Sequence, residues 1–578
     1  MNKKQWLPVT VKEMQLSGWD KPDVIFFSGD AYIDHPSFGT AMIARVMESA
    51  GMKVAIVPQP NWQDDLRDFK KFGKPNCFFA VTAGCMDSMV NHYTAFKRLR
   101  SDDAYSPGGK SGFRPDYATE KYCTILKNLF PDVPVIIGGI EASQRRFTHY
   151  DYWQDKLLPS ILVSSKADIL VYGMGEITIY NICKHLLKGG SFDEIKKMPQ
   201  VAYIQPQKSK IYSNEQNKTI FLKSHEECLQ SKKNYAQNFV TVETESNKMF
   251  PTCLVQKYSD FEIVANPPNP VISTEKLDGF YNLPFTRLPH PKYFKKGIIP
   301  AYEMIKHSIT IHRGCFGGCS FCAISMMQGK FIISRSEKSI LNEIEKITQM
   351  QDFKGFISDL GGPSANMYCM TGKNMKICSE CSRYSCIFPE KCKNMNINHS
   401  ELISLYRKAS KIKGVKKLFI NSGIRYDMFF EKNGLTKDGK EYFLEVMKNH
   451  VSGRLKVAPE HTQTKVLNLM RKPLYKVFKD FYRLFDAENK KSKLNLQLVP
   501  YFISSHPGCD LKDMSDLLKE TSSQFRQLEQ VQDFTPTPMT LSTVMFYTGL
   551  NPYTGEKINV TTNLTEKRKQ FNFFFIKK

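Results

Sequence analysis

The chain lacks the long apolar runs that would carry it into or across a membrane. No stretch of its 578 residues approaches the ~18 consecutive apolar residues that a membrane-spanning helix needs. The opening MNKKQWLPVTVKEM has basic residues but no apolar stretch behind them, which is not the pattern of a secretory signal. The sequence therefore predicts a cytoplasmic protein that does not bind a membrane.

Arginine is scarce among the basic residues. The formal net charge is +24, but only 18 of the 81 basic residues are arginine. Lysine has no planar fork for paired hydrogen bonds to phosphates or base edges, and the lysines are spread along the chain. A nucleic acid is therefore not favoured as a partner, although the charge keeps an RNA-modifying enzyme as an alternative.

The amino-terminal part has no GxGxxG dinucleotide fingerprint after any of its strand-like runs. These runs (PDVIFFSGD, KVAIVPQP, NCFFAVTAG, PVIIGGIEAS and DILVYGMGE) end in turns and alternate with helical stretches. Alternation of this kind predicts a parallel sheet covered by helices on both faces. We expect an α/β fold that begins with a doubly wound parallel-sheet domain over residues 1–200.

The rest of the chain divides by composition. Residues 201–304 are rich in proline and lysine and predict a connecting region packed on the core. Strand-like and helical stretches alternate again over 305–510, which predicts a partial (β/α) barrel with its active site at the carboxyl ends of the strands. Residues 511–578 are expected to form a C-terminal extension.

Three cysteines occupy one glycine-rich stretch, HRGCFGGCSFCAI. Cys315, Cys319 and Cys322 have the spacing Cys-x3-Cys-x2-Cys and follow the strand-like HSITI. A four-iron cluster normally takes four thiolates, so three thiolates would leave one iron open to another ligand. A structural zinc site completed by a fourth residue, or three unbound thiols, are the alternatives.

This loop, with an aromatic residue before its third cysteine, resembles that of the radical S-adenosylmethionine (SAM) superfamily. The stretches LPFTRLPHPKY, DLGGPSANMY, SGIRYD and KVAPEH resemble the YgiQ family within it. The resemblance implies a [4Fe-4S] cluster on Cys315, Cys319 and Cys322 that cleaves SAM reductively to a 5′-deoxyadenosyl radical. The radical would act on an unknown substrate, and the electron would come from a donor such as flavodoxin or ferredoxin. The alternative within the superfamily is an RNA-modifying enzyme of methylthiotransferase type.

The resemblance also implies SAM contacts at later strand ends. Gly361 and Gly362 stand where the family places a glycine pair whose backbone meets the SAM amino group, but Pro363 replaces the usual acidic neighbour. Arg425 in SGIRYD and Glu460 in VAPEH are candidates for contacts with the ribose or carboxylate. The same two stretches offer three further polar side chains, Ser422, Asp427 and His461. No residue that acts on the substrate is identified.

The amino-terminal sheet resembles the cobalamin-binding-like domains that precede some radical SAM cores. The axial-ligand pattern there is Asp-x-His-x-x-Gly. Here the sequence reads DHPSFG, with Asp34 adjacent to His35 and Gly39 four residues further on. The broken pattern favours a structural role for His35 and disfavours cobalamin, which stays an alternative cofactor.

Five more cysteines are concentrated in an apparent insertion at 366–398. At the chain's average frequency a stretch of this length would hold fewer than one. They are Cys369, Cys378, Cys381, Cys386 and Cys392. The Cys378-x2-Cys381 pair is a common metal knuckle, and a zinc ion and a second cluster are both open interpretations. A non-enzymatic iron–sulfur or zinc protein is therefore a further alternative.

Overall fold

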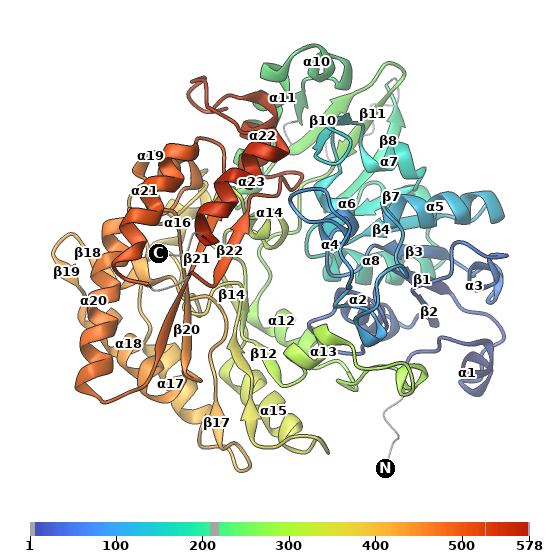
Figure 1. Cartoon of the computed structure of the whole chain (residues 1–578). Coiled ribbons are helices and arrows are strands. Elements are labelled where there is room, and N and C mark those ends of the chain that lie inside the picture. Colours follow the sequence, from blue (N-terminus) through green and yellow to red (C-terminus); the bar gives the residue numbers. More distant parts are fainter. Residues whose placement is uncertain (1–5, 208–218, 526–527, 576–578) are drawn as a thin grey trace. The chain divides into compact units, whose positions relative to one another are not determined.

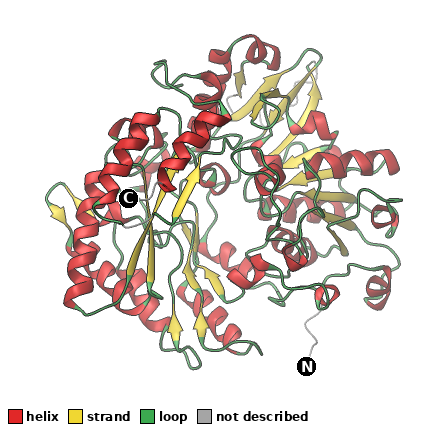
Figure 2. Cartoon of the chain, in the orientation of Figure 1, coloured by secondary structure: helices red, strands yellow, loops and turns green. Residues whose placement is uncertain are grey.

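The computed structural model describes residues 6–207, 219–525 and 528–575, and the chain divides into two compact units. The first unit comprises Met1–Glu245, Phe250–Pro270 and Gly279–Lys306, and the second comprises Ser246–Met249, Val271–Asp278 and His307–Lys578. Figure 1 follows the chain from end to end, and Figure 2 distinguishes its helices from its strands. Within the described ranges, no helix has the length and apolar character to cross a membrane.

A nine-stranded sheet organises the first unit, in the order β2-β1-β3-β4-β7-β8-β11-β10-β9. Strands β2 to β7 in this order are parallel, and β8, β11 and β10 each run antiparallel to the strand before them. Every residue of β1, β2 and β3 is buried, as expected for parallel strands covered on both faces. The strands are β1 Val24–Ser28, β2 Val54–Pro58, β3 Phe78–Thr82, β4 Val135–Gly138, β7 Ile169–Val171, β8 Val201–Pro206, β9 Thr219–Leu222, β10 Cys253–Lys257 and β11 Phe261–Ala265.

Helices connect the parallel strands of this sheet. Helix α2 contacts β1 and β2 and packs against α8, while α5 contacts β3 and packs against α7. A small hairpin of β5 (His149–Asp151) and β6 (Lys156–Leu158) stands apart from the main sheet. The helices are α1 Val11–Leu16, α2 Gly39–Ser49, α3 Arg67–Lys70, α4 Ser88–His92, α5 Ala118–Leu129, α6 Ile140–Gln144, α7 Ile161–Ser165, α8 Glu176–Leu187, α9 Phe192–Ile195, α10 His225–Gln230, α11 Lys232–Ser246, α12 Thr274–Tyr281 and α13 Pro300–Ile305.

The sheet extends into the region that the sequence predicts to be a connecting segment, 201–304. Strands β8 to β11 come from this region, and β8 pairs directly with β7. Short apolar runs separated by lysines and prolines give no local signal of which strand they will pair with. The pairing partners of these strands lie far away in the sequence, so only the fold reveals them.

Short parallel strands alternate with helices in the second unit. Strand β12 pairs with β16, β15 pairs with β17, and β20, β21 and β22 form a three-stranded sheet, all in parallel. The antiparallel pairs are β13 with β14 and β18 with β19. The α/β class predicted from the sequence is confirmed. The strands are β12 Ser308–Thr310, β13 His312–Arg313, β14 Ile333–Ser334, β15 Phe356–Ile357, β16 Asp359–Gly361, β17 Lys417–Leu418, β18 Phe430–Glu431, β19 Gly434–Leu435, β20 Arg454–Glu460, β21 Gln497–Ser504 and β22 Gln530–Asp533.

The helices of the second unit include five amphipathic ones that pack on these strands. They bury their apolar stripes, as in Ile340, Ile344 and Ile347 of α15, and leave charged residues outside. The helices are α14 Ile324–Gln328, α15 Glu337–Thr348, α16 Met375–Ser379, α17 Ser400–Ala409, α18 Lys437–Asn449, α19 Thr464–Met470, α20 Tyr475–Lys491, α21 Leu511–Ser522, α22 Leu541–Thr548 and α23 Leu564–Asn572.

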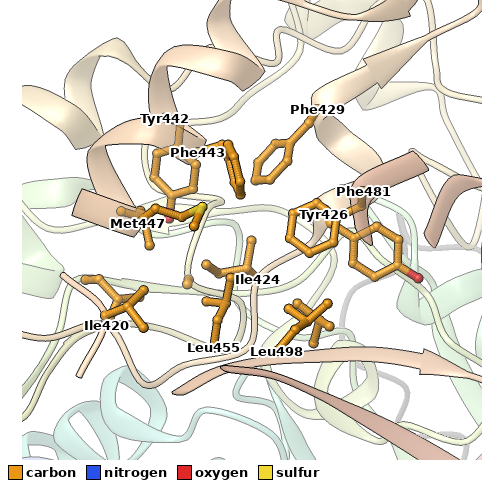
Figure 3. Packing of buried hydrophobic residues seen from close by; sticks show 14 of the residues in the cluster. Ile420, Ile424, Tyr426, Phe429, Tyr442, Phe443, Met447, Leu455, Phe481 and Leu498 are labelled. Carbon is orange, nitrogen blue, oxygen red and sulfur yellow. The ribbon is translucent and has the colours of Figure 1, made fainter. Parts of the chain in front are cut away.

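An aromatic core fixes one loop of the second unit firmly in place. Tyr426 stacks on Phe481 of α20, with ring centroids 5.2 Å apart, and meets Phe478 edge-on at 5.8 Å. Figure 3 shows Tyr426 and Phe481 side by side among the buried residues of this core. Burial of one such side chain contributes about 1.5–3 kcal/mol. The core therefore anchors the neighbours of Tyr426 in the chain, Arg425 and Asp427.

The last helix, α23, is joined to the core by a buried charge. The Lys567 side chain is fully buried, and its ammonium group lies 2.9 Å from a carboxylate oxygen of Asp533. It also donates a hydrogen bond to the carbonyl oxygen of Phe534 at 2.7 Å. A buried ammonium group is stable only with such partners. The C-terminal extension therefore packs as part of the second unit.

Candidate metal centre

The three cysteines of the glycine-rich stretch lie in the loop between β13 and α14. Two glycines allow this loop to turn back on itself. Gly314 has φ +87°, and a Cβ there would lie 2.3 Å from the carbonyl oxygen of Phe331. Gly318 has φ +61°, and a Cβ there would lie 2.3 Å from the carbonyl oxygen of Tyr384. Any other residue at these two positions would be strained and would also clash with backbone.

The three thiols are electrostatic neighbours and are half-buried. Burial, followed by the charge of Cys319, raises the pKa of Cys315, and the same two causes raise the pKa of Cys322 to about 12. The charge of Cys315 also contributes to the shift at Cys322. A thiolate among other thiolates is costly unless a cation or metal offsets the charge, so this group is suited to a metal centre.

Arg425 supplies a positive charge at the middle cysteine. Its Nη1 donates to Cys319 Sγ at 3.3 Å, while Nε and Nη2 donate to the two carboxylate oxygens of Asp427 at 2.9 and 2.7 Å. Burial alone would lower the pKa of Arg425, but Asp427 and the charges of Cys319 and Cys315 hold it well above the usual value. The bidentate pair therefore keeps a permanent cation aimed at the sulfur.

Glu460 approaches the same loop from the carboxyl end of β20. Its backbone is left-handed, with φ +68°, and its carboxylate lies 3.6 Å from the ammonium group of Lys472. Burial raises the pKa of Glu460, against the opposing charges of Lys472 and Arg425. The charge of Glu460 also contributes to the raised pKa of Cys322. A non-glycine residue held in this conformation is common at binding sites.

The predicted glycine pair ends β16. A Cβ at Gly361 would lie 2.5 Å from Ser422 Oγ, and a Cβ at Gly362 would lie 2.5 Å from the ring of His312. The carboxylate of Asp359 accepts hydrogen bonds from the hydroxyl and backbone N–H of Ser422. Both glycines are therefore required by close approaches of neighbouring side chains.

His312 is a buried polar side chain with unused bonding capacity. Its ring is fully buried, and neither ring nitrogen has a hydrogen-bond partner among the described residues. Burial lowers the pKa of His312 to about 3, so the ring is neutral at physiological pH. An unpartnered polar group of this kind beside Gly362 fits a site that receives a polar ligand.

The structure places Arg425 against Cys319, Gly362 beside His312 of β13, and Gly361 against Ser422, and the charge of Glu460 acts on Cys322. It directs His461 elsewhere. The His461 ring is buried, with Nε2 3.5 Å from the thiol of Cys509. Two residues near this site were not predicted from the sequence, Asp359 and Lys472. Asp359 could have been found, because it is an acidic residue two positions before the glycine pair. Lys472 carries no local signal, since it reaches Glu460 only through the fold.

The donor set fits an iron–sulfur cluster in its chemistry. Among residues 6–207, 219–525 and 528–575, no three His, Cys, Asp or Glu side chains are placed to hold a single metal ion. A cubane binds each thiolate on a different iron, so its three sulfur ligands do not have to meet at one point. A Cβ at Gly317 would lie 3.3 Å from Cys315 Sγ and 2.9 Å from Arg425 Nη1, so the cradle around the thiols depends on glycine.

The strand order of the first unit reverses between β1 and β3, and α/β sheets bind ligands at the carboxyl ends of strands at such a point. Polar side chains lie close together there. Arg114 is buried and donates to Asp30 Oδ1 at 2.6 Å and to the Ala83 carbonyl oxygen at 2.7 Å. A Cβ at Gly84 would lie 2.1 Å from Asp30 Oδ1. His35 is fully buried, with its Nδ1 accepting from the Ser37 N–H. Cobalamin stays an alternative cofactor of this unit.

Comparison with known proteins places this chain in a family. Residues 6–308 match the family model described as Radical SAM N-terminal, and residues 529–577 match a domain of unknown function, DUF3362. The first match covers more than half of the chain and defines the class, that of radical SAM proteins.

Curated relatives are similar over the full length. A UPF0313 protein of Porphyromonas gingivalis is 54% identical over 573 residues, which are 99% of this chain and 90% of the relative. One from Bacteroides thetaiotaomicron is also 54% identical, over 99% of this chain and 94% of the relative. One from Clostridium botulinum strain Loch Maree is 47% identical, over 99% and 87%. The chain belongs to the UPF0313 family of radical SAM proteins, which confirms the resemblance to the YgiQ family.

Two solved structures show a distant likeness. The radical SAM methyltransferase TsrM from Kitasatospora setae, with cobalamin and a [4Fe-4S] cluster bound, is 12% identical; the match covers 90% of this chain and 74% of that chain with a TM-score of 0.48. OxsB, a cobalamin-dependent SAM radical enzyme, is 11% identical over 91% and 55%, with a TM-score of 0.47. At this similarity, what those proteins bind is not transferred to this chain.

Proposed function

We propose that this chain is a cytoplasmic radical SAM enzyme that holds one [4Fe-4S] cluster on Cys315, Cys319 and Cys322. One observation carries the proposal. The fold gathers three neighbouring thiols in a single loop and directs the guanidinium group of Arg425 to the middle one at 3.3 Å. When bound, the cluster supplies the electron that splits SAM into methionine and a 5′-deoxyadenosyl radical.

Arg425 and Asp427 act together on the charge of the site. The thiolates bring negative charge into a half-buried loop, and the Arg425 cation partly offsets it. Hydrogen bonds from N–H groups to the sulfur ligands of a cluster also influence its potential. Asp427 holds the guanidinium group in place through two hydrogen bonds, so its role is to position Arg425.

Gly361, Gly362, Arg425 and Glu460 are proposed to bind SAM. Gly361 is buried in β16, whereas Gly362 directly after it is half-buried, and its backbone is proposed to bond to the SAM amino group. His312 beside Gly362 keeps a neutral, buried ring whose nitrogens are available to orient a polar group. Glu460 is held by Lys472, and the pair can take ribose hydroxyl groups as acceptor and donor.

Formation of 5′-deoxyadenosine tests this proposal. Anaerobically reconstituted protein, incubated with SAM and a one-electron reductant, is expected to produce 5′-deoxyadenosine and methionine. Cys319→Ala should lose the product and about four irons per chain, because a cubane lacking one of three thiolates is unstable. Cys369→Ser is the matched control, since Cys369 is exposed and outside this loop. Absence of product from protein that carries its full iron content would overturn the proposal.

A further inference from the structure

Four of the five cysteines in the insertion 366–398 lie together. The Cys381 N–H donates to the Cys378 carbonyl oxygen at 3.2 Å, and the Cys392 N–H donates to the Cys386 carbonyl oxygen at 2.8 Å. The side chains of Cys386 and Cys392 pack against the same apolar cluster, and Asn394, two residues after Cys392, lies with its side-chain amide 3.2 Å from Cys378 Sγ. The segments that carry the two cysteine pairs are therefore neighbours in the fold.

Nitrogen donors already point at two of these sulfur atoms. The Asn394 side-chain amide lies 3.2 Å from Cys378 Sγ, and the ammonium group of Lys330 lies 3.7 Å from Cys381 Sγ. Lys330 is only 2% exposed, and its other hydrogen bond goes to the Arg383 carbonyl oxygen at 2.8 Å. The described part of the chain pairs Lys330 with no carboxylate. A buried cation without an acid partner requires negative charge from another source, and metal-bound thiolates supply it.

Cys369, the fifth cysteine of the insertion, stands apart. It is exposed, its φ is +58°, and its N–H donates to Ser334 Oγ at 2.8 Å. Burial and the charge of Glu401 raise the pKa of its thiol, and no other cysteine contributes to the shift. The sequence alone cannot separate Cys369 from the other four, whereas the fold does.

We propose that Cys378, Cys381, Cys386 and Cys392 bind a second metal centre, distinct from the cluster loop, as a tetrathiolate site. Four thiolates are the donor set of structural zinc and of four-iron clusters alike, and either centre would carry the negative charge that Lys330 faces. Because no three ligands in the described ranges already meet at one point, binding would draw the sulfur atoms inward by side-chain rotation.

This second centre would hold the insertion against the loop of the first. The Cys386 N–H donates to the Phe316 carbonyl oxygen at 3.0 Å, and the Ser385 hydroxyl donates to the Gly317 carbonyl oxygen at 2.8 Å. Phe316 is buried in a small apolar cluster with Met367, Met370, Ile387, Met395 and Met428, against which Cys386 and Cys392 pack. Phe316 and Gly317 lie between Cys315 and Cys319, so the insertion packs directly beside the loop of the first site.

Metal analysis of cysteine variants tests the proposal. In full-length protein purified anaerobically, Cys378→Ser/Cys381→Ser should contain one centre fewer than wild type, which is about four irons or one zinc. A loss of iron identifies a second cluster, and a loss of zinc identifies a zinc site. Cys369→Ser should keep the wild-type content of both metals. Unchanged iron and zinc in the double variant would overturn the proposal.

A measurement on wild-type protein covers the case in which the double variant does not fold. Alkylation followed by mass spectrometry should label the exposed Cys369 faster than the other four, which the metal protects. Chelator treatment strong enough to remove the metal should then expose all four together. If a chelator leaves their labelling rates unchanged, or if the four react as fast as Cys369 beforehand, there is no tetrathiolate centre. This outcome is separate from the fate of the first cluster, which is read at Cys315, Cys319 and Cys322.

Discussion

The guanidinium group of Arg425 donates a hydrogen bond to the thiol of Cys319, although the two residues are more than one hundred positions apart. Tyr426 holds this contact in place by stacking on Phe481, which fixes the loop that presents Arg425. The chemistry of the cysteine loop therefore depends on packing in a core that contains no cysteine ligand.

Removal of the Arg425 guanidinium should lower the reduction potential of the cluster. Arg425→Gln deletes a cation and a donor to sulfur, both of which stabilise the reduced, more negative cluster. We expect the reduction potential to fall by about 59 mV, which for a one-electron couple is a tenfold change in the equilibrium constant of reduction. Redox titration followed by EPR measures it. Arg407→Gln, on the exposed surface of α17, is the control and should leave the potential unchanged; a wild-type potential in Arg425→Gln would contradict the assigned role.

Gly362→Ala should weaken SAM binding without removing the cluster. The added Cβ would lie 2.5 Å from the buried His312 ring, which must then move. The displaced ring would disturb the position proposed for the SAM amino group, so SAM affinity should fall about tenfold, which is about 1.4 kcal/mol. Gly423→Ala is the matched control, because a Cβ there meets nothing within 4 Å. Calorimetric titration of SAM into both variants compares them, and equal affinities would show that the glycine pair does not meet SAM.

Stability of the first unit should fall as the pH drops below about 6.5. Burial, and then the charge of Arg145, lowers the pKa of His149 to about 3 in the folded chain, whereas the unfolded chain has its ordinary value of 6.5. Below pH 6.5 the His149 side chain binds a proton in the unfolded state but stays neutral in the folded state. The free energy of unfolding therefore decreases, by about 1.4 kcal/mol per pH unit from this one group, until the pH approaches 3.

Calorimetry of wild type and His149→Gln between pH 7.5 and 5 measures this effect. Glutamine can keep the donor to the Phe147 carbonyl oxygen that His149 Nδ1 supplies at 3.1 Å, but it does not titrate. On acidification from pH 7.5 to 5, the melting temperature of the variant should fall less than that of wild type. Identical pH profiles would mean that His149 is charged or accessible in the folded chain.

The cluster loop and the α/β alternation could be predicted from the sequence because both are local patterns. Three cysteines at fixed spacing among glycines, and apolar runs that end in glycine turns, need no knowledge of distant partners. The glycine pair at 361–362 was proposed through the family resemblance, which places such a pair after this strand. Arg425 and Glu460 were found only through family resemblance, since a lone charged residue at a strand end has no distinctive pattern.

Pairings between remote segments could not be read from the sequence. Strands β8 to β11 extend the first sheet although their prolines and lysines suggest a connector. Lys472 reaches Glu460, and Lys330 reaches Cys381, from stretches with no motif of their own. Whether five clustered cysteines act as a set also depends on the fold, which separates Cys369 from the rest.

Electron–nuclear double resonance of the reduced protein tests the open iron position most directly. SAM labelled with nitrogen-15 in its amino group and oxygen-17 in its carboxylate is added to the reduced cluster. Three thiolate ligands leave one iron for the cofactor, so both labels should show hyperfine coupling to the cluster, and Cys378→Ser/Cys381→Ser should retain it. A cluster at full iron content whose spectrum shows neither coupling would contradict SAM binding at this site.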